Sequence, residues 1–180
     1  MSAPEPTSLF HDLSDQHGVS IYDHSVATPF LLVLLRHLGC SFCRKTLHEI
    51  QESVDTIREC GYNLGLVHMN ASEQTIPQLQ KFELEHLPRF YDPKRLLYQD
   101  LGVNQVEIKH LFRTRTLREG AKAAIQYQGA IPTANPLQLP GAFLIDNGNV
   151  VAGETVMYAE EQPDILSLLI YSEALNVPTA

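Results

Sequence analysis

The chain has 180 residues, a length typical of a single globular domain. Its hydrophobic fraction of 44% and charged fraction of 19% are ordinary for a folded protein and argue against overall disorder. A formal net charge of -8 disfavours nucleic acid and anionic membrane surfaces as partners, because both would repel the chain. The longest apolar run is far shorter than the ~18 residues that span a bilayer, and the first residues lack the basic start and apolar core of a signal peptide. We therefore expect a cytoplasmic protein.

The first half of the chain predicts a strand followed by a helix. Residues 1–20 show no sustained periodicity, and we interpret them as a lead-in segment to one domain over residues 21–180. The apolar run Phe30–Leu35 lies between a proline and a glycine, which favours a strand buried on both faces. Apolar residues then recur at helical spacing and predict an amphipathic helix that ends at Gly61; they are Cys43, Leu47, Ile50, Val54 and Ile57.

This alternation continues up to residue 101. We predict a strand over residues 62–69, a helix over 73–85, a short extended piece over 87–91 and a short helix over 93–101. Strand, helix, strand, helix is the order of an α/β sheet. We therefore predict a central mixed β-sheet that is flanked by helices on both faces.

The stretch from residue 103 to 139 predicts a polar helix followed by a long loop. Five of the chain's 13 basic residues lie in it: Lys109, Arg113, Arg115, Arg118 and Lys122. A solvated helical face and a site for an anion or a partner would both account for these charges. Further along, two apolar runs flank Asn147-Gly148, a pair that favours the type I′ turn of a β-hairpin. Apolar residues between 165 and 175 predict a terminal helix.

Two of the three cysteines, Cys40 and Cys43, form a C-x-x-C motif, and the third is Cys60. So few cysteines, and an odd number of them, do not fit the disulfide framework of a secreted domain. The motif lies between the predicted strand and the first turn of the predicted helix. A helix N-terminus and basic neighbours such as Arg36 favour an anion, and the thiolate is the reactive form of cysteine. Within one helical turn, the second sulfur can also reach the first and close a small disulfide.

Three interpretations of the motif remain open on the residues alone. A dithiol/disulfide redox site fits its placement and its basic flank. A zinc site needs four ligands, and Cys60 with one of His37, His48 or His68 would have to complete it. The cysteines would otherwise be two small residues in a tight turn, with no chemical role. The placement favours the redox site, which needs no cofactor and no metal.

Two segments carry a resemblance to a known family. They are Leu34–Arg44, which contains an Arg-x-x-Gly-Cys-x-x-Cys core, and Tyr91–Gly102. Both resemble peroxiredoxin-like proteins of the alkyl hydroperoxide reductase/thiol-specific antioxidant group, and the similarity extends over about residues 18–175. It implies a thioredoxin-like fold and thiol redox activity. The implied substrates are disulfides of proteins or small molecules, or hydroperoxides, with a thiol as electron donor. Arg36 and Gly39 are the supporting residues that the core implies.

The resemblance extends to the segment before the predicted hairpin. In the thioredoxin-like superfamily, a cis-proline opens the strand that enters the final hairpin. Pro140 matches that position by its distance from the Asn-Gly turn. An X-Pro bond adopts the cis form more readily than other peptide bonds do. The resemblance thus implies a cis turn at Pro140 that leaves backbone groups of Leu139 free to pair with a substrate chain.

The chain departs from the family patterns around its cysteines. Thioredoxins place Gly-Pro between the two cysteines, where this chain has Ser41-Phe42. They also bury a carboxylate in the preceding strand, and Phe30–Leu35 contains none. Typical peroxiredoxins carry a Thr/Ser-x-x-Cys motif, so Cys43 corresponds to their attacking thiol and Cys40 to their hydroxyl. The order of attack stays open: Cys40 as the exposed first cysteine of such a turn, or Cys43 by analogy with peroxidases.

From these observations we predict a thiol–disulfide oxidoreductase whose catalytic residues are Cys40 and Cys43. One alternative is a thiol peroxidase that uses the same pair. The other is a non-catalytic interaction module with a thioredoxin-like fold. Cys60 is expected to take no part in any of them.

Overall fold

The structure is a computed structural model that describes residues 8–36, 38, 40–127 and 135–174. Its centre is a five-stranded sheet with the strand order β3-β2-β1-β4-β5. β1 (Phe30–Leu34) is parallel to β2 (Asn63–His68), and β2 is parallel to β3 (Arg89–Tyr91). On its other side β1 pairs antiparallel with β4 (Gly141–Asp146), which pairs antiparallel with β5 (Asn149–Thr155). The predicted mixed sheet is confirmed.

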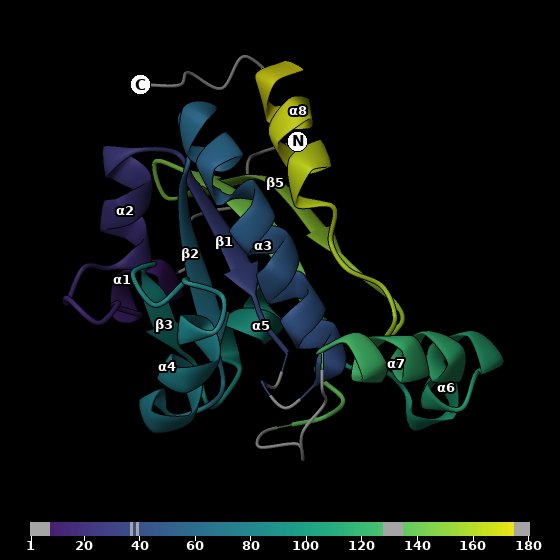
Figure 1. The fold of residues 1–180 in the computed structure, drawn as a ribbon. Coiled ribbons are helices and arrows are strands. Elements are labelled where there is room, and N and C mark those ends of the chain that lie inside the picture. Colours follow the sequence, from purple (N-terminus) through teal and green to yellow (C-terminus); the bar gives the residue numbers. More distant parts are fainter. Residues whose placement is uncertain (1–7, 37, 39, 128–134, 175–180) are drawn as a thin grey trace.

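Helices precede, connect and follow the strands (Figure 1). They are α1 (Leu9–Asp12), α2 (Ile21–Ala27), α3 (Ser41–Glu59), α4 (Ser72–Gln80), α5 (Leu96–Asp100), α6 (Ile108–Leu111), α7 (Thr114–Tyr127) and α8 (Ile165–Ala174). Within the described ranges, none of them is both long and apolar enough to cross a membrane.

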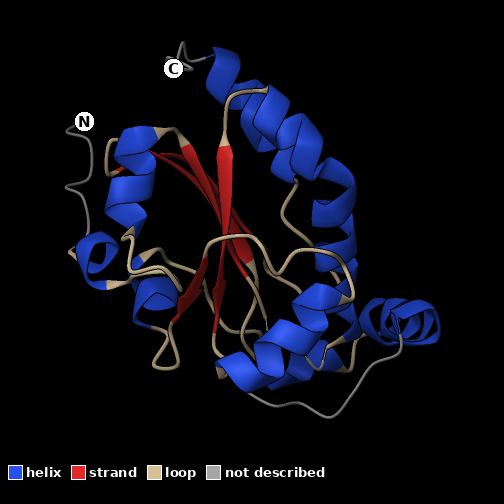
Figure 2. Ribbon diagram, turned by 60° about the vertical axis from the view of Figure 1, so that its left-hand side comes forward, coloured by secondary structure: helices blue, strands red, loops and turns tan. Residues whose placement is uncertain are grey.

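The helices cover both faces of the sheet, as Figure 2 shows. Buried side chains of α3, α4 and α8 form one core with Leu31 and Val33 of β1. Side chains of α1, α2 and α5 form a second core with Phe30, Leu32 and Leu34 of the same strand. Successive side chains of a strand point to opposite faces, so β1 has an apolar residue at every position and each is 0% exposed.

The buried face and the C-terminal end of the long helix α3 follow from the sequence. The apolar stripe that predicts it is buried, and the helix stops where glycine was expected to stop it. Gly61 has a φ of +85°, a left-handed conformation that glycine adopts without strain. Its N–H donates to the Arg58 carbonyl (2.9 Å), and the Tyr62 N–H donates to the Ile57 carbonyl (3.2 Å). These two bonds are the Schellman pattern of a helix C-terminus.

The hairpin between β4 and β5 also confirms its sequence signal. Asn147 and Gly148 form the turn with φ values of +47° and +77°, as a type I′ turn requires. The Gly148 N–H donates to the Ser25 hydroxyl (2.9 Å), and the Asn147 N–H donates to the Ser25 carbonyl (3.0 Å). The turn is therefore fixed against the end of α2.

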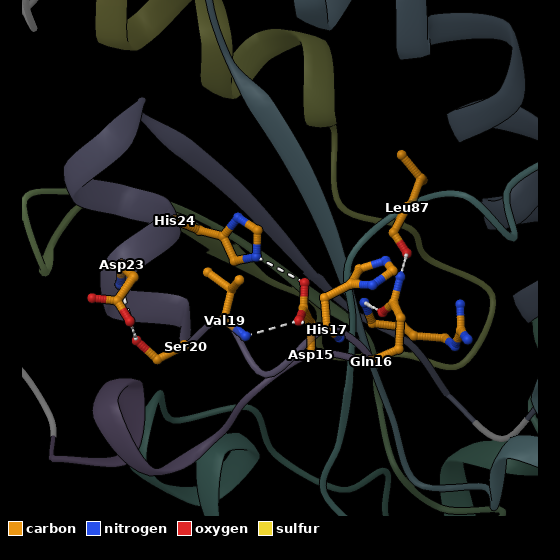
Figure 3. Close-up of polar contacts among 9 residues, drawn as sticks. Asp15, Gln16, His17, Val19, Ser20, Asp23, His24 and Leu87 are labelled. Atoms are coloured by element: carbon orange, nitrogen blue, oxygen red, sulfur yellow. Dashed lines mark hydrogen bonds and ion pairs between the residues drawn. The ribbon is translucent and has the colours of Figure 1, made fainter.

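Part of the predicted lead-in segment packs against the rest of the chain. Residues 8–20 are built into the domain: Phe10 is 0% exposed in the second core. The Asp15 carboxylate accepts the backbone N–H groups of His17 (2.8 Å) and Val19 (3.0 Å) and lies 3.0 Å from Nε2 of His24 (Figure 3). Burial raises the pKa of Asp15, but these hydrogen bonds and the His24 charge outweigh it and hold the pKa below its ordinary value.

Gln16, in the same segment, covers the outer edge of the sheet. Its side-chain Nε2 donates to the Leu87 carbonyl (3.1 Å), and its Oε1 accepts the Arg89 N–H (3.0 Å). Arg89 begins β3, which is an edge strand. A single side-chain amide thus pairs with the backbone on both sides of Pro88, as a neighbouring strand would.

The helix predicted over residues 73–85 is shorter than expected. α4 ends at Gln80, and a turn over 81–83 follows in which Glu83 has a φ of +58°. The turn lets Leu84 and Leu87 enter the first core, where they are 1% and 2% exposed. Burial of these two leucines therefore accounts for the early end of the helix.

Two glycines should respond in opposite ways to an added methyl group. A Cβ at Gly65, in β2, would lie 2.4 Å from Cζ of Phe30 and 3.0 Å from Phe90, inside a packed core. A Cβ at Gly120, inside α7, would meet Phe42 at an ordinary 3.7 Å. We expect Gly65→Ala to lower the free energy of unfolding by about 1–3 kcal/mol. Gly120→Ala should raise it by about 0.5–1 kcal/mol, because alanine favours a helix interior. Urea unfolding measures both, and equal losses would contradict the packing described.

Candidate functional site

The C-x-x-C motif lies where the structure leaves β1 and enters α3. Cys40 is the N-cap residue of α3 and is half-buried, and its side chain makes no cap hydrogen bond. Cys43 lies in the first turn of the helix and is 1% exposed. The placement of both cysteines at a helix N-terminus after a buried strand confirms the expectation from sequence. Both thiols are free.

The two sulfurs have different surroundings. Burial raises the pKa of Cys43 from 9.0 to about 12, and the neighbouring Cys40 contributes to the rise. The positive charge of Arg36 and a hydrogen bond to the Arg36 carbonyl, 3.9 Å from the Cys43 sulfur, oppose this rise without cancelling it. Cys43 is therefore a neutral thiol at neutral pH when both cysteines are reduced.

Arg36 is held at the site by hydrogen bonds to distant backbone groups. Its side chain is buried, and the residue is 3% exposed. Nε donates to the Gln138 carbonyl (3.1 Å), Nη1 to the Ala159 carbonyl (2.7 Å) and Nη2 to the Pro136 carbonyl (3.4 Å). Arg36 thus ties the cysteine loop to two segments that are more than a hundred residues away in the sequence.

Two polar residues that the sequence did not single out hold the loop before Cys40. Asn70 follows β2, and its Oδ1 accepts the Leu38 N–H (3.3 Å) while its Nδ2 donates to Gln74 of α4 (3.0 Å). Tyr98 of α5 is 0% exposed, and its hydroxyl donates to the Leu35 carbonyl (2.6 Å) at the end of β1. A polar residue directly after a buried strand is the signal that would have found Asn70; Tyr98 lies in the segment that carries the family resemblance.

Leu139 and Pro140 differ from their prediction. No peptide bond among the described residues is cis, so the cis turn expected at Pro140 is wrong. The Leu139 N–H donates to the Asn104 carbonyl (3.2 Å), and the Leu139 carbonyl accepts the Gln138 side-chain amide (3.2 Å). Leu139 is also 1% exposed. Its backbone is therefore already paired within the chain and is not open to a substrate in this conformation.

The N-terminal turn of α3 is packed against α7 and the connection between β5 and α8. Phe42 lies between the two cysteines, under the Arg36 guanidinium (5.7 Å to the ring centroid), and contacts α7 at Gly120. Thr46 contacts Oε1 of Gln162, and Thr116 of α7 donates to Glu160 (2.6 Å). These contacts fix the surroundings of the buried thiol.

Of the other predicted residues, those that the structure describes lie away from this site. Gly39 lies outside the described residues, as does His37. Cys60 is the C-cap of α3, about 30 Å along the helix axis from Cys40 at 1.5 Å per residue. His68 is buried, and its Nδ1 lies 2.7 Å from the Asn70 carbonyl. A zinc set completed by Cys60 is therefore excluded, and no group of three or more His, Cys, Asp or Glu in the described ranges could hold a metal ion.

Comparisons with known proteins support the fold. The chain matches no protein-family model and no curated protein. Among solved structures, it is similar to a cysteine-to-serine mutant of peroxiredoxin 6 of Arenicola marina, with a TM-score of 0.67 at 14% identity over 98% of this chain and 74% of that chain. A cysteine-to-serine mutant of Xanthomonas campestris peroxiredoxin Q gives a TM-score of 0.63 at 14% identity over 97% of both chains.

A solved structure with a different printed role is similar as well. A putative thiol:disulfide interchange protein DsbE from Chlorobium tepidum gives a TM-score of 0.55 at 15% identity over 89% of both chains. At these identities the likeness shows the fold alone. It confirms the thioredoxin-like fold, and the resemblance to peroxiredoxins holds at the level of fold.

Proposed function

We propose that this protein carries out thiol–disulfide redox chemistry, with Cys40 as the attacking thiol and Cys43 as the resolving thiol. The observation that carries the proposal is the difference between two sulfurs in one helical turn. Cys40 is half-buried at the helix N-terminus, where a substrate sulfur can approach it. Cys43 is 1% exposed, and burial raises its pKa to about 12. An attacking thiol needs access and a resolving thiol needs only its partner.

The reaction then has two steps. The Cys40 thiolate attacks one sulfur of a substrate disulfide, and the other substrate sulfur leaves as a thiolate. The Cys43 sulfur next attacks Cys40, losing its proton to the solvent, and the second substrate sulfur leaves as a thiolate. The substrate gains two electrons, and the protein loses two in the Cys40–Cys43 disulfide. A thiol donor restores the dithiol by the reverse exchange.

The electrostatics of Cys43 support this order. The neighbouring Cys40 contributes to raising the pKa of Cys43. Once Cys40 is held in a mixed disulfide, it carries no charge, and this contribution disappears. The buried thiol therefore becomes easier to ionise at the stage where it has to attack.

A hydroperoxide is the second candidate substrate, favoured by the fold shared with peroxiredoxins. Cys40 would take one peroxide oxygen as a sulfenic acid, releasing an alcohol, and Cys43 would condense with it, releasing water. The opposite order starts from Cys43, as the peroxidase analogy implies. It would require a thiolate from a buried thiol whose pKa is about 12.

A redox titration in defined thiol/disulfide buffers tests the proposal. Cys40, Cys43 and Cys60 are scored separately by alkylation and peptide mass. We expect a reversible Cys40–Cys43 couple between roughly -120 and -270 mV, the range of known redox-active pairs, with Cys60 alkylated throughout. A pair that stays reduced at every potential, or that resists reduction far below this range, would instead indicate a non-catalytic module.

A further inference from the structure

Helix α7 presents an apolar stripe to the solvent. Leu117 is 57% exposed and Ile125 is 85% exposed, and Ala121 and Ala124 between them are exposed as well. At 100° per residue these four positions fall on one side of the helix. Thr116 and Ala123 are buried and, with Gly120, form the side that packs inward. The apolar stripe thus takes no part in the packing of α7 against the rest of the described residues.

A basic stripe runs beside the apolar one. Arg115, Arg118 and Lys122 are exposed and follow it around the helix. Residues 107–127 hold five basic and two acidic residues, a net charge of +3, whereas the whole chain has a net charge of -8. The two acidic residues only form exposed pairs, Glu107 with Lys109 and Glu119 with Arg118 and Lys122. Exposed ion pairs contribute little to stability and are easily replaced. The excess of positive charge on this segment therefore remains available to a negatively charged partner.

The helix that carries this surface packs beside the cysteines through its inward side. Gly120 of α7 packs on Phe42, the residue before Cys43 in the C-x-x-C motif. In Figure 1, α7 lies against the N-terminal end of α3 and projects away from the sheet. A partner seated on α7 would therefore bind at the end of α3 that carries Cys40 and Cys43.

We infer that the α7 surface, defined as Leu117, Ala121, Ala124 and Ile125 with Arg115, Arg118 and Lys122, docks an acidic amphipathic segment of a disulfide-containing protein. This inference rests on the proposed function and adds the class of partner to it. Apolar side chains of the partner cover the apolar stripe, and its carboxylates pair with the basic stripe. An anionic membrane is a poorer occupant, because the rest of the chain carries a net charge of -11 and would be repelled from it.

The test compares two synthetic peptides with the same apolar positions and the same intramolecular disulfide. One peptide has glutamate at its polar positions and the other has lysine, and a small neutral disulfide, bis(2-hydroxyethyl) disulfide, serves as the reference substrate. The fully reduced protein is mixed with each, and its oxidation is followed by alkylation. We expect the acidic peptide to react at least about tenfold faster than the basic one at low salt, with most of the difference lost at about 0.5 M salt.

Two sets of variants locate the effect. Leu117→Ser with Ile125→Ser, and separately Arg115→Glu, Arg118→Glu and Lys122→Glu together, should lower the ratio of the acidic-peptide rate to the small-disulfide rate by about tenfold. The matched control is Leu166→Ser with Ile170→Ser on α8, which removes two other exposed apolar side chains and should keep the ratio. Thermal unfolding first establishes that each variant is folded.

The outcomes separate this inference from the proposed function. Failure to reduce any of the three disulfides would overturn the proposed function. Equal rates with both peptides, beside normal reduction of the small disulfide, would overturn only the docking surface. A dimer that Leu117→Ser and Ile125→Ser dissociate would show that a second copy covers the stripe, and α7-dependent binding to phosphatidylserine vesicles would show that a membrane does. Either result would also overturn the inference.

Discussion

Replacing Cys40 with serine should reduce the rate of thiol–disulfide turnover by at least about 10³-fold, because the reaction loses its attacking atom. Replacing Cys43 with serine should also stop turnover but leave the first step intact. The protein would then accumulate a mixed disulfide between Cys40 and the substrate. Intact mass measured after incubation with a disulfide distinguishes the two variants, since only Cys43→Ser should carry the substrate adduct.

The structure offers a control and a contradicting outcome for this prediction. Cys60→Ser changes the cysteine at the far end of α3 and should leave turnover as it is. The fold should survive in Cys43→Ser, because a hydroxyl can donate to the Arg36 carbonyl as the thiol does. If Cys40→Ser still formed a sulfenic acid with a hydroperoxide and Cys43→Ser did not, the roles would be reversed and Cys43 would be the attacking thiol.

Acidification from pH 7 to pH 5 should lower the free energy of unfolding by about 2 kcal/mol through His68 alone. Burial lowers the pKa of His68 from 6.5 to about 4, so the folded protein keeps this side chain neutral. Below pH 6.5 the unfolded chain binds a proton that the folded protein does not bind. The stability that the neutral His68 allows is therefore fully present above pH 6.5, and it is lost as the pH falls towards 4. Urea unfolding at several pH values measures it.

A pair of variants isolates this histidine from the other titrating groups. In His68→Gln, the free energy of unfolding should fall by about 2 kcal/mol less between pH 7 and pH 5 than in the wild type, because glutamine does not titrate. His17 is exposed, and His17→Gln should leave the wild-type dependence in place. Equal slopes for His68→Gln and the wild type would contradict the buried neutral state.

Local patterns predicted the elements that carry the cysteines. The apolar run became β1, the helical stripe became α3 and Asn147-Gly148 became a type I′ turn. Each of these signals acts over a few residues, and burial or a positive φ then fixes the element. Residues 8–20 escaped prediction because α1 is only four residues long and Phe10 is its one buried side chain. One buried side chain gives no periodic pattern from which a helix could be predicted.

The missing parts of the site depend on contacts between distant segments. Nothing within a few residues of Arg36 indicates that it binds the carbonyls of Pro136, Gln138 and Ala159. The same holds for Leu139, whose backbone is occupied by Asn104 and by the side chain of its own neighbour. Spacing in the sequence correctly placed Pro140 directly before a strand, β4. The conformation of the Leu139–Pro140 peptide bond depends on these tertiary contacts.

The side chain of Gln16 has a consequence for handling the protein. An uncovered edge strand is a template on which other chains add. Gln16 occupies the Leu87 carbonyl just before β3 and the Arg89 N–H that begins it, where such an addition would start. A truncated form that begins at α2 would lack this cover and the Phe10 anchor together. We expect such a shortened protein to self-associate through the β3 edge and to form fibre-like aggregates on storage. Expression should therefore retain the residues that precede α2.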